Sequence, residues 1–235
     1  MGILLRVIPE GANLDGTSLI AGFHGIGATG YWTVKFLVNE LKAKRRCYLD
    51  YDEAPAVATF SAGGIATPYE VYEAQGLSLL KAEVSPVREK ESVFFRELAS
   101  WVERSGVREV GLVGGLDESL KTDDDAYKVV MTSAFTRKGG LKGEPTLEED
   151  KIIVGPVASL LNLFEMDGFP AYAVLAYSST ERVDPRASAS AVKFLASRYG
   201  FQADTAPLIK GAEVLEGEMK QYEEKERRPP ASVYS

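Results

Sequence analysis

Short apolar runs alternate with helix-length amphipathic segments along most of the 235-residue chain. The runs Ile3 to Ile8, Ser18 to Phe23 and Arg46 to Tyr51 predict strands. Between the second and third runs, the apolar positions from Tyr31 to Ala43 recur mainly at three-and-four spacing, which predicts a helix that packs inward by one face. A glycine-rich turn joins the second strand to this helix.

The middle of the chain predicts a hairpin, because short β-rich runs are separated by turn residues such as Gln75-Gly76. Between Leu116 and Asp150 the pattern loosens, so this segment is predicted to be an insertion or a mobile surface. Helices alternating with strands predict a three-layer α/β/α sandwich with a mostly parallel, mixed sheet. The remaining predicted helices are Lys90 to Arg104, Pro156 to Phe164 and Pro185 to Tyr199, and the remaining strands are Val107 to Val113, Lys128 to Phe135 and Phe169 to Tyr177.

Length and composition favour one compact domain. With 45% hydrophobic residues the chain can bury a sizeable core, and we expect a single α/β domain over residues 1–226. That domain would end in a charged helix from Pro207 to Lys225. Residues 227–235 are expected to form a flexible tail, held away from the body by Pro229-Pro230.

Charge and cysteine content limit the classes of partner. The net charge of -7 and a pI near 5.0 argue against a general nucleic-acid or anionic-membrane surface. No stretch reaches the length of a membrane span, and the first residues lack the pattern of a signal peptide. The single cysteine, Cys47, cannot form an internal disulfide and falls in a predicted buried strand. We therefore expect a soluble, cytoplasmic protein.

The glycine turn allows two interpretations. Gly25, Gly27 and Gly30 fit G-x-G-x-x-G, and Asp50 follows the next predicted strand, where a dinucleotide-binding fold places its ribose acid. Glycines are also selected wherever a strand must turn sharply into a helix that packs closely upon it. Nucleotide binding through these four residues thus stands beside a purely structural role.

Other catalytic or metal-binding sets are poorly supported. His24 is the only histidine, and no G-x-S-x-G elbow accompanies it. One histidine and one cysteine leave too few ligands for the usual zinc sites. Asp123 to Asp125 could hold Mg²⁺, although consecutive aspartates in a loop are usually solvated. We expect no catalytic residues, no bound metal and no cofactor.

The printed sequence ends in Val233-Tyr234-Ser235, a hydrophobic residue, a tyrosine and a residue with the terminal carboxylate. An extended peptide of this kind can place its apolar side chain in a pocket, use the phenol for a hydrogen bond and pair its carboxylate with a cation. These three residues are the predicted partner-binding site.

Two blocks of sequence resemble the proteasome assembly chaperone family of archaea and, more distantly, eukaryotes. The run Gly22-Phe23-His24-Gly25-Ile26-Gly27-Ala28-Thr29-Gly30 is similar to the family's glycine-rich strand-to-helix signature. Val154 to Leu161, followed after a helix by Gly168 to Leu175, resembles its later glycine, helix and strand block. Together the two blocks set the framework expected for residues 1 to about 200, whereas residues 116–150 carry no motif that matches the family.

The resemblance implies a sandwich like that of nucleoside phosphorylases, a structural glycine turn, homo-oligomers and no enzymatic activity. The ending is similar to the hydrophobic-Tyr-X motif that enters pockets between α-subunits of the proteasome core particle. It implies that Val233 anchors in the pocket, that Tyr234 fixes the tail and that the Ser235 carboxylate pairs with a pocket lysine. The expected function is that of an ATP-independent assembly chaperone or activator, with a nucleotide-binding, Rossmann-like enzyme as the alternative.

Overall fold

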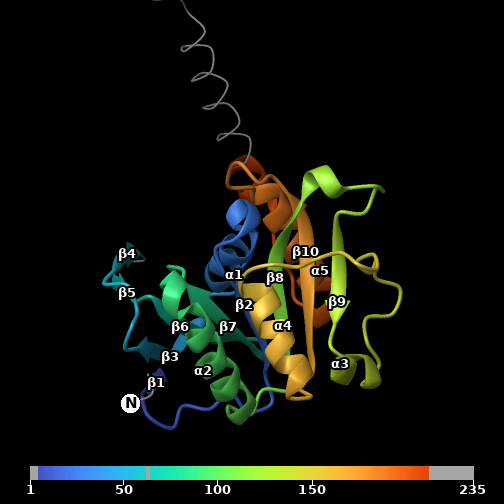
Figure 1. Ribbon diagram of the computed structural model, residues 1–235. Coiled ribbons are helices and arrows are strands. Elements are labelled where there is room, and N and C mark those ends of the chain that lie inside the picture. The colour runs from blue at the N-terminus through green and yellow to red at the C-terminus, as the bar shows by residue number, and fades with distance from the viewer. Residues whose placement is uncertain (1–4, 62–63, 212–235) are drawn as a thin grey trace, which may run out of the picture.

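An eight-stranded mixed sheet runs through the centre of the molecule, and helices cover both of its faces (Figure 1). The computed structural model describes residues 5–61 and 64–211. The sheet has the spatial order β1-β3-β6-β7-β2-β8-β10-β9. Its strands are β1 (Leu5–Ile8), β2 (Ser18–Gly22), β3 (Lys44–Tyr51), β6 (Tyr69–Ala74), β7 (Leu77–Ala82), β8 (Glu109–Asp117), β9 (Tyr127–Met131) and β10 (Ala171–Ser178). The helices are α1 (Thr29–Glu40), α2 (Glu91–Arg104), α3 (Ser133–Arg137), α4 (Pro156–Met166) and α5 (Pro185–Tyr199).

The centre of the sheet is parallel and its two sides are antiparallel. The four central strands, β7, β2, β8 and β10, are parallel to one another. On one side the sheet continues with β6, β3 and β1, and on the other side with β9, and each of these strands pairs antiparallel with its neighbour. β6 and β7 are joined by Gln75 and Gly76, with φ of 50° and 76°, the conformation that favours tight two-residue hairpins. The predicted hairpin and mixed α/β sandwich are therefore confirmed. The sheet is parallel only at its centre and not for the most part, because four of the seven strand pairs described in it are antiparallel.

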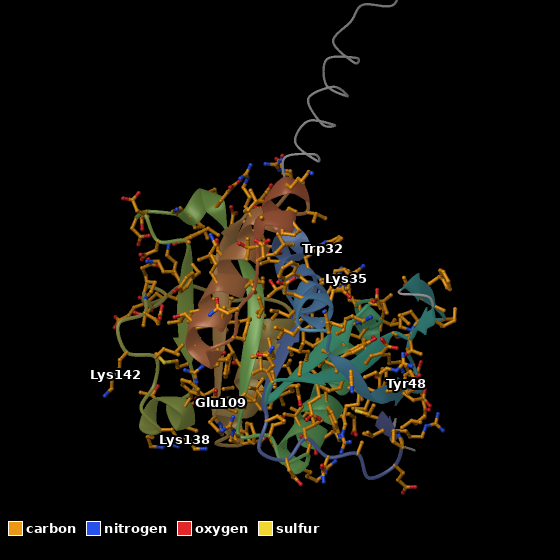
Figure 2. The ribbon with its side chains drawn as sticks, turned by 180° about the vertical axis from the view of Figure 1, so that it is seen from behind. Trp32, Lys35, Tyr48, Glu109, Lys138 and Lys142 are labelled. Carbon is orange, nitrogen blue, oxygen red and sulfur yellow. The ribbon has the colours of Figure 1, made fainter. Side chains whose placement is uncertain are left out.

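Each face of the sheet carries its own hydrophobic core, because successive strand residues point to opposite sides. Leu19 and Ala21 of β2 belong to the core beneath α2 and α4, whereas Ile20 belongs to the core beneath α1 and α5. Figure 1 shows α2 and α4 in front of the sheet, and Figure 2 shows α5 and α1 from behind. This division produces the three layers.

A second, two-stranded sheet lies outside the main one. β4 (Thr59–Ser61) and β5 (Gly64–Ala66) pair antiparallel with each other, with Phe60 opposite Ile65. In Figure 1 this hairpin projects at the left of the molecule. We call β4 and β5 together the hairpin arm.

Two segments differ from their predicted form. β8 continues through Gly114-Gly115 to Asp117 instead of ending at the glycines. The predicted strand Lys128 to Phe135 stops at Met131, because the Thr132 side chain accepts a hydrogen bond from Phe135 N and begins α3. The loosely patterned segment 116–150 thus supplies β9, an edge strand of the main sheet.

The described residues reach only the first turn of the last predicted helix, since 206–211 are helical. The rest of that helix and the predicted tail 227–235 lie outside them.

Candidate functional site at the glycine turn

The first turn of α1 packs directly on the backbone of β2 and β8. A Cβ at Gly22 would lie 2.1 Å from the Gly30 carbonyl oxygen, and a Cβ at Gly30 would lie 2.4 Å from the Val113 carbonyl oxygen. A Cβ at Gly115 would meet the Ile26 carbonyl oxygen at 2.4 Å. Only hydrogen fits at these three positions, so they have a packing role.

Several hydrogen-bond donors at the start of α1 are used within the protein. Tyr31 N donates to the Phe23 carbonyl at 3.1 Å, and Ala28 N donates to the Gly25 carbonyl at 2.9 Å. The Thr29 hydroxyl donates to the Ile26 carbonyl at 3.0 Å. A phosphate at a helix N-terminus needs free amides that point toward it. These hydrogen bonds favour the structural interpretation of the glycine turn.

Asp50 is not brought near the glycine turn. It lies on β3, and β6 and β7 separate that strand from β2. Its carboxylate lies 2.7 Å from a guanidinium nitrogen of Arg6, which also lies 3.0 Å from Asp52. In a dinucleotide-binding fold the acidic residue follows a strand adjacent to the glycine strand. The structure therefore keeps Gly25, Gly27 and Gly30 in one turn but places Asp50 in a separate ion pair, away from that turn.

His24 joins the turn to a buried charge network. Its Nε2 lies 3.1 Å from the Glu83 carbonyl oxygen, and its ring stacks on Tyr31 with 4.2 Å between centroids. The Tyr31 hydroxyl donates to the Glu83 carboxylate at 2.8 Å. Lys81 Nζ lies 2.9 Å from Glu83 and 3.3 Å from Glu70, and all three charged side chains are buried. On the outside of α1, Lys35 Nζ donates to the Tyr31 hydroxyl at 2.9 Å (Figure 2).

Two members of the network, Glu83 and Lys81, are stabilised in their charged forms. Burial would raise the pKa of Glu83, but the hydrogen bonds from Lys81 and Tyr31 outweigh it and lower that pKa below its ordinary 4.5. Burial would lower the pKa of Lys81, but Glu83, Tyr72 and Glu70 raise it above 10.5. Sequence reasoning missed this network, although a lysine inside the apolar run Leu77 to Ala82 was a signal of a buried pair.

An apolar pocket of about 380 Å³ opens over the glycine turn. Ile26 comes from the turn, Leu116 and Leu120 from the end of β8 and beyond, and Ile152 and Val154 from the segment before α4. Among the described lining residues, the ionisable side chains are His24 and Asp117, and the Asp117 carboxylate already accepts a hydrogen bond from Ser119 N at 2.8 Å. The pocket suits an apolar side chain better than a phosphate.

The other candidate residues have structural partners. Lys128 of β9 is buried and contacts the carboxylates of Asp123, Asp125 and Glu148. Within the described ranges, no cluster of three or more His, Cys, Asp or Glu residues is arranged to hold a metal. Cys47 is buried in β3 as predicted, and burial raises the pKa of its thiol to about 11. Among the same residues, every helix falls short of the length and apolar character that a membrane crossing requires.

The sequence profile of the PAC2 family matches residues 19–223, a range that includes the glycine turn, the pocket and most of both hydrophobic cores. The chain belongs to the PAC2 family. The resemblance to proteasome assembly chaperones is thereby confirmed at the level of the family. None of the curated proteins compared with this PAC2-family chain matches it.

Solved structures share the PAC2 fold. Pyrococcus furiosus PbaA, described as an archaeal homolog of proteasome-assembly chaperone, has a TM-score of 0.77 at 22% identity, over 95% of this chain and 100% of its own. P. furiosus PbaB, described as an archaeal proteasome activator, has a TM-score of 0.74 at 20% identity, over 94% and 99%. A PAC2 family protein from Streptomyces avermitilis has a TM-score of 0.63 at 20% identity, over 87% and 95%.

The predicted partner-binding residues Val233, Tyr234 and Ser235 lie outside the described residues.

Proposed function

We propose that this PAC2-family protein is an ATP-independent assembly chaperone or activator of the proteasome, and that it binds core-particle α-subunits through Val233-Tyr234-Ser235. The observation that carries the proposal is the family match, together with structural relatives described as a chaperone homolog and a proteasome activator. The printed C-terminal sequence adds a peptide of matching chemistry. No observation at the glycine turn favours a nucleotide-dependent enzyme.

Each of the three terminal residues has a separate task in this proposal. Val233 enters an apolar pocket, the ring and hydroxyl of Tyr234 hold the peptide, and the terminal carboxylate on Ser235 pairs with a lysine of the α-subunits. The binding energy stabilises assembling α-subunits or shifts the gate of the core particle toward its open state. Catalysis by the protein itself has no part in either outcome.

Pull-down of core-particle α-subunits tests the tail. We expect Tyr234→Ala, or one residue added after Ser235, to abolish capture, because the hydroxyl or the position of the carboxylate is lost. Tyr222→Ala removes another tyrosine upstream and serves as the matched control that keeps binding. Undiminished capture by the Tyr234 variant would refute the tail mechanism.

Two further assays separate the chaperone from the activator. Peptide hydrolysis by complete core particles should rise on addition of an activator, whereas the yield of α-rings from free subunits should rise with an assembly chaperone. A protein that changes neither rate nor yield is not a member of this functional class.

A further inference from the structure

A polar pocket of about 470 Å³ lies between the hairpin arm and the end of α1. Its walls come from the last turn of α1, the start of β3 and Gly64–Ala66 of β5. Among the described residues that line it, three are cationic and none is acidic, although the whole chain carries a net charge of -7. The cations are Lys42, Arg45 and Lys81. A concave surface lined by one sign of charge attracts ligands of the opposite sign.

The carboxylates that pair with two of these cations lie below the pocket surface. Lys81 Nζ lies 2.9 Å from Glu83 and 3.3 Å from Glu70, and Arg45 also pairs with Glu70. The side chains of Glu70 and Glu83 are 0% and 3% exposed, and neither residue lines the pocket. The pocket surface is therefore supplied by the cations and not by their carboxylate partners.

Three side chains of the pocket keep hydrogen-bond donors free for a ligand. Arg45 donates to Glu70 at 3.1 Å and interacts with the Tyr72 hydroxyl, and a guanidinium with five N–H donors keeps others free after these two contacts. Asn39 and Lys42 are exposed. Within the described part of the chain, neither of these two side chains has a hydrogen-bond or ion-pair partner.

Local structure holds the two exposed cations in place. Lys42 follows α1 with a φ of 49°, in the left-handed region where glycine or asparagine is usual after a helix. A lysine in this conformation carries backbone strain, and such strain is common at functional sites. On β3, the Arg45 guanidinium lies over the ring of Tyr48, 4.3 Å from its centroid, and Figure 2 labels Tyr48. This stacking fixes the plane of the N–H groups.

These features suit a multiply charged oxyanion on a small molecule. An arginine fork and a lysine are the side chains that proteins use for phosphate and carboxylate groups. The volume of about 470 Å³ lies within the range of roughly 300–1,000 Å³ of small-molecule sites, while the net charge of -7 disfavours a long acidic polymer. We propose that the pocket binds a small molecule through a phosphate or polycarboxylate group held by Asn39, Lys42 and Arg45.

Isothermal titration calorimetry at constant ionic strength tests the pocket, with pyrophosphate and citrate as the phosphate and polycarboxylate probes. We expect at least one probe to bind saturably at one site per molecule, and the probe that binds more tightly identifies the group. Lys42→Gln should weaken this binding about tenfold, because a charge-assisted hydrogen bond is lost. Lys44→Gln is the matched control, since it removes the same charge from an exposed lysine that does not line the pocket. It should keep the affinity within about twofold, because solvent and salt screen an exposed charge.

Lys42→Gly separates binding from folding. Glycine adopts a positive φ without strain, so this variant should be at least as stable to heat as the wild type and still lose affinity as Lys42→Gln does. The proposal is overturned if neither probe binds saturably, if Lys42→Gln and Lys44→Gln lose affinity equally, or if Lys42→Gly binds as the wild type does. None of these outcomes involves the C-terminal residues, so the test is independent of the proposed proteasome contact.

Discussion

Gly22 and Gly25 stand in the same motif but in different surroundings. A Cβ at Gly22 would meet the Gly30 carbonyl oxygen at 2.1 Å, whereas a Cβ at Gly25 would meet nothing within 4 Å. Gly25 has a φ of -163°, an extended conformation open to any residue. The role of each glycine in this motif therefore depends on the atoms that lie opposite it.

We predict that Gly22→Ala lowers the free energy of unfolding by about 3 kcal/mol or prevents folding, because helix and strand backbones must separate. Gly25→Ala is the matched control and should change it by less than about 1 kcal/mol. Urea unfolding measures both. Equal losses in the two variants would contradict the packing role of Gly22.

Lys81 is the cation that two buried carboxylates share. Lys81→Met should cost about 3–5 kcal/mol, because Glu70 and Glu83 would each lose a buried partner. Arg6→Met is the control: Arg6 also pairs with two carboxylates, Asp50 and Asp52, but at the exposed edge of the sheet, where such pairs contribute about 0–1 kcal/mol. Urea unfolding at pH 7 should separate the two. Similar losses would mean that burial does not set the strength of the Lys81 pairs.

The same network predicts acid sensitivity. The pKa of Glu83 is lower in the folded protein than its ordinary 4.5, so the folded state binds fewer protons than the unfolded state. The contribution of Glu83 is complete above pH 4.5 and is lost as pH falls through the lowered pKa. Stability measured between pH 6 and pH 3 should fall less steeply for Glu83→Gln than for the wild type. Identical slopes would exclude Glu83 as a source of the effect.

At the scale of elements, α5 is fastened at both ends. At its start, the Asp184 carboxylate accepts hydrogen bonds from Arg186 N at 3.0 Å and Ala187 N at 3.2 Å, and its other oxygen accepts from Ser179 N at 3.1 Å. At its end, Arg198 donates to Glu109 of β8 at 2.7 Å. Helix α5 is thus hydrogen-bonded to the sheet at both ends of the parallel strands.

We expect Asp184→Ala to cost about 1–2 kcal/mol, since an N-cap is lost together with a bond that ties the helix to the end of β10. Asp184→Asn keeps one acceptor oxygen and should cost less. Thermal unfolding shows which of the two variants is the less stable. If Asn were as harmful as Ala, charge at the helix N-terminus and not the capping bond would be the cause.

For the whole molecule, the proposed function predicts an effect of tail number. The expected homo-oligomer would present several C-terminal tails to one α-ring, and linked binding events raise the overall affinity by about 10²–10⁴. A free peptide with the sequence of residues 227–235 should therefore bind the core particle at least about tenfold more weakly than the whole protein. Binding of the peptide and of the protein to surface-immobilised core particles measures both affinities. Equal affinity would show that one tail suffices.

The sequence by itself determined most of the elements and the three-layer arrangement. Apolar periodicity located α1 and α2, and turn residues located the β6–β7 hairpin, because these signals depend on neighbours along the chain. The bounds predicted for one further helix, Pro185 to Tyr199, are those of α5 in the structure.

Only the tertiary structure decided which residues lie together. It placed β6 and β7 between β3 and β2 and so removed Asp50 from the glycine turn. It set carbonyl oxygens opposite Gly22, Gly30 and Gly115, and it gathered Ile26, Leu120 and Val154 around one pocket. Strand order and close approach are made by residues far apart in the chain, and no local pattern encodes them.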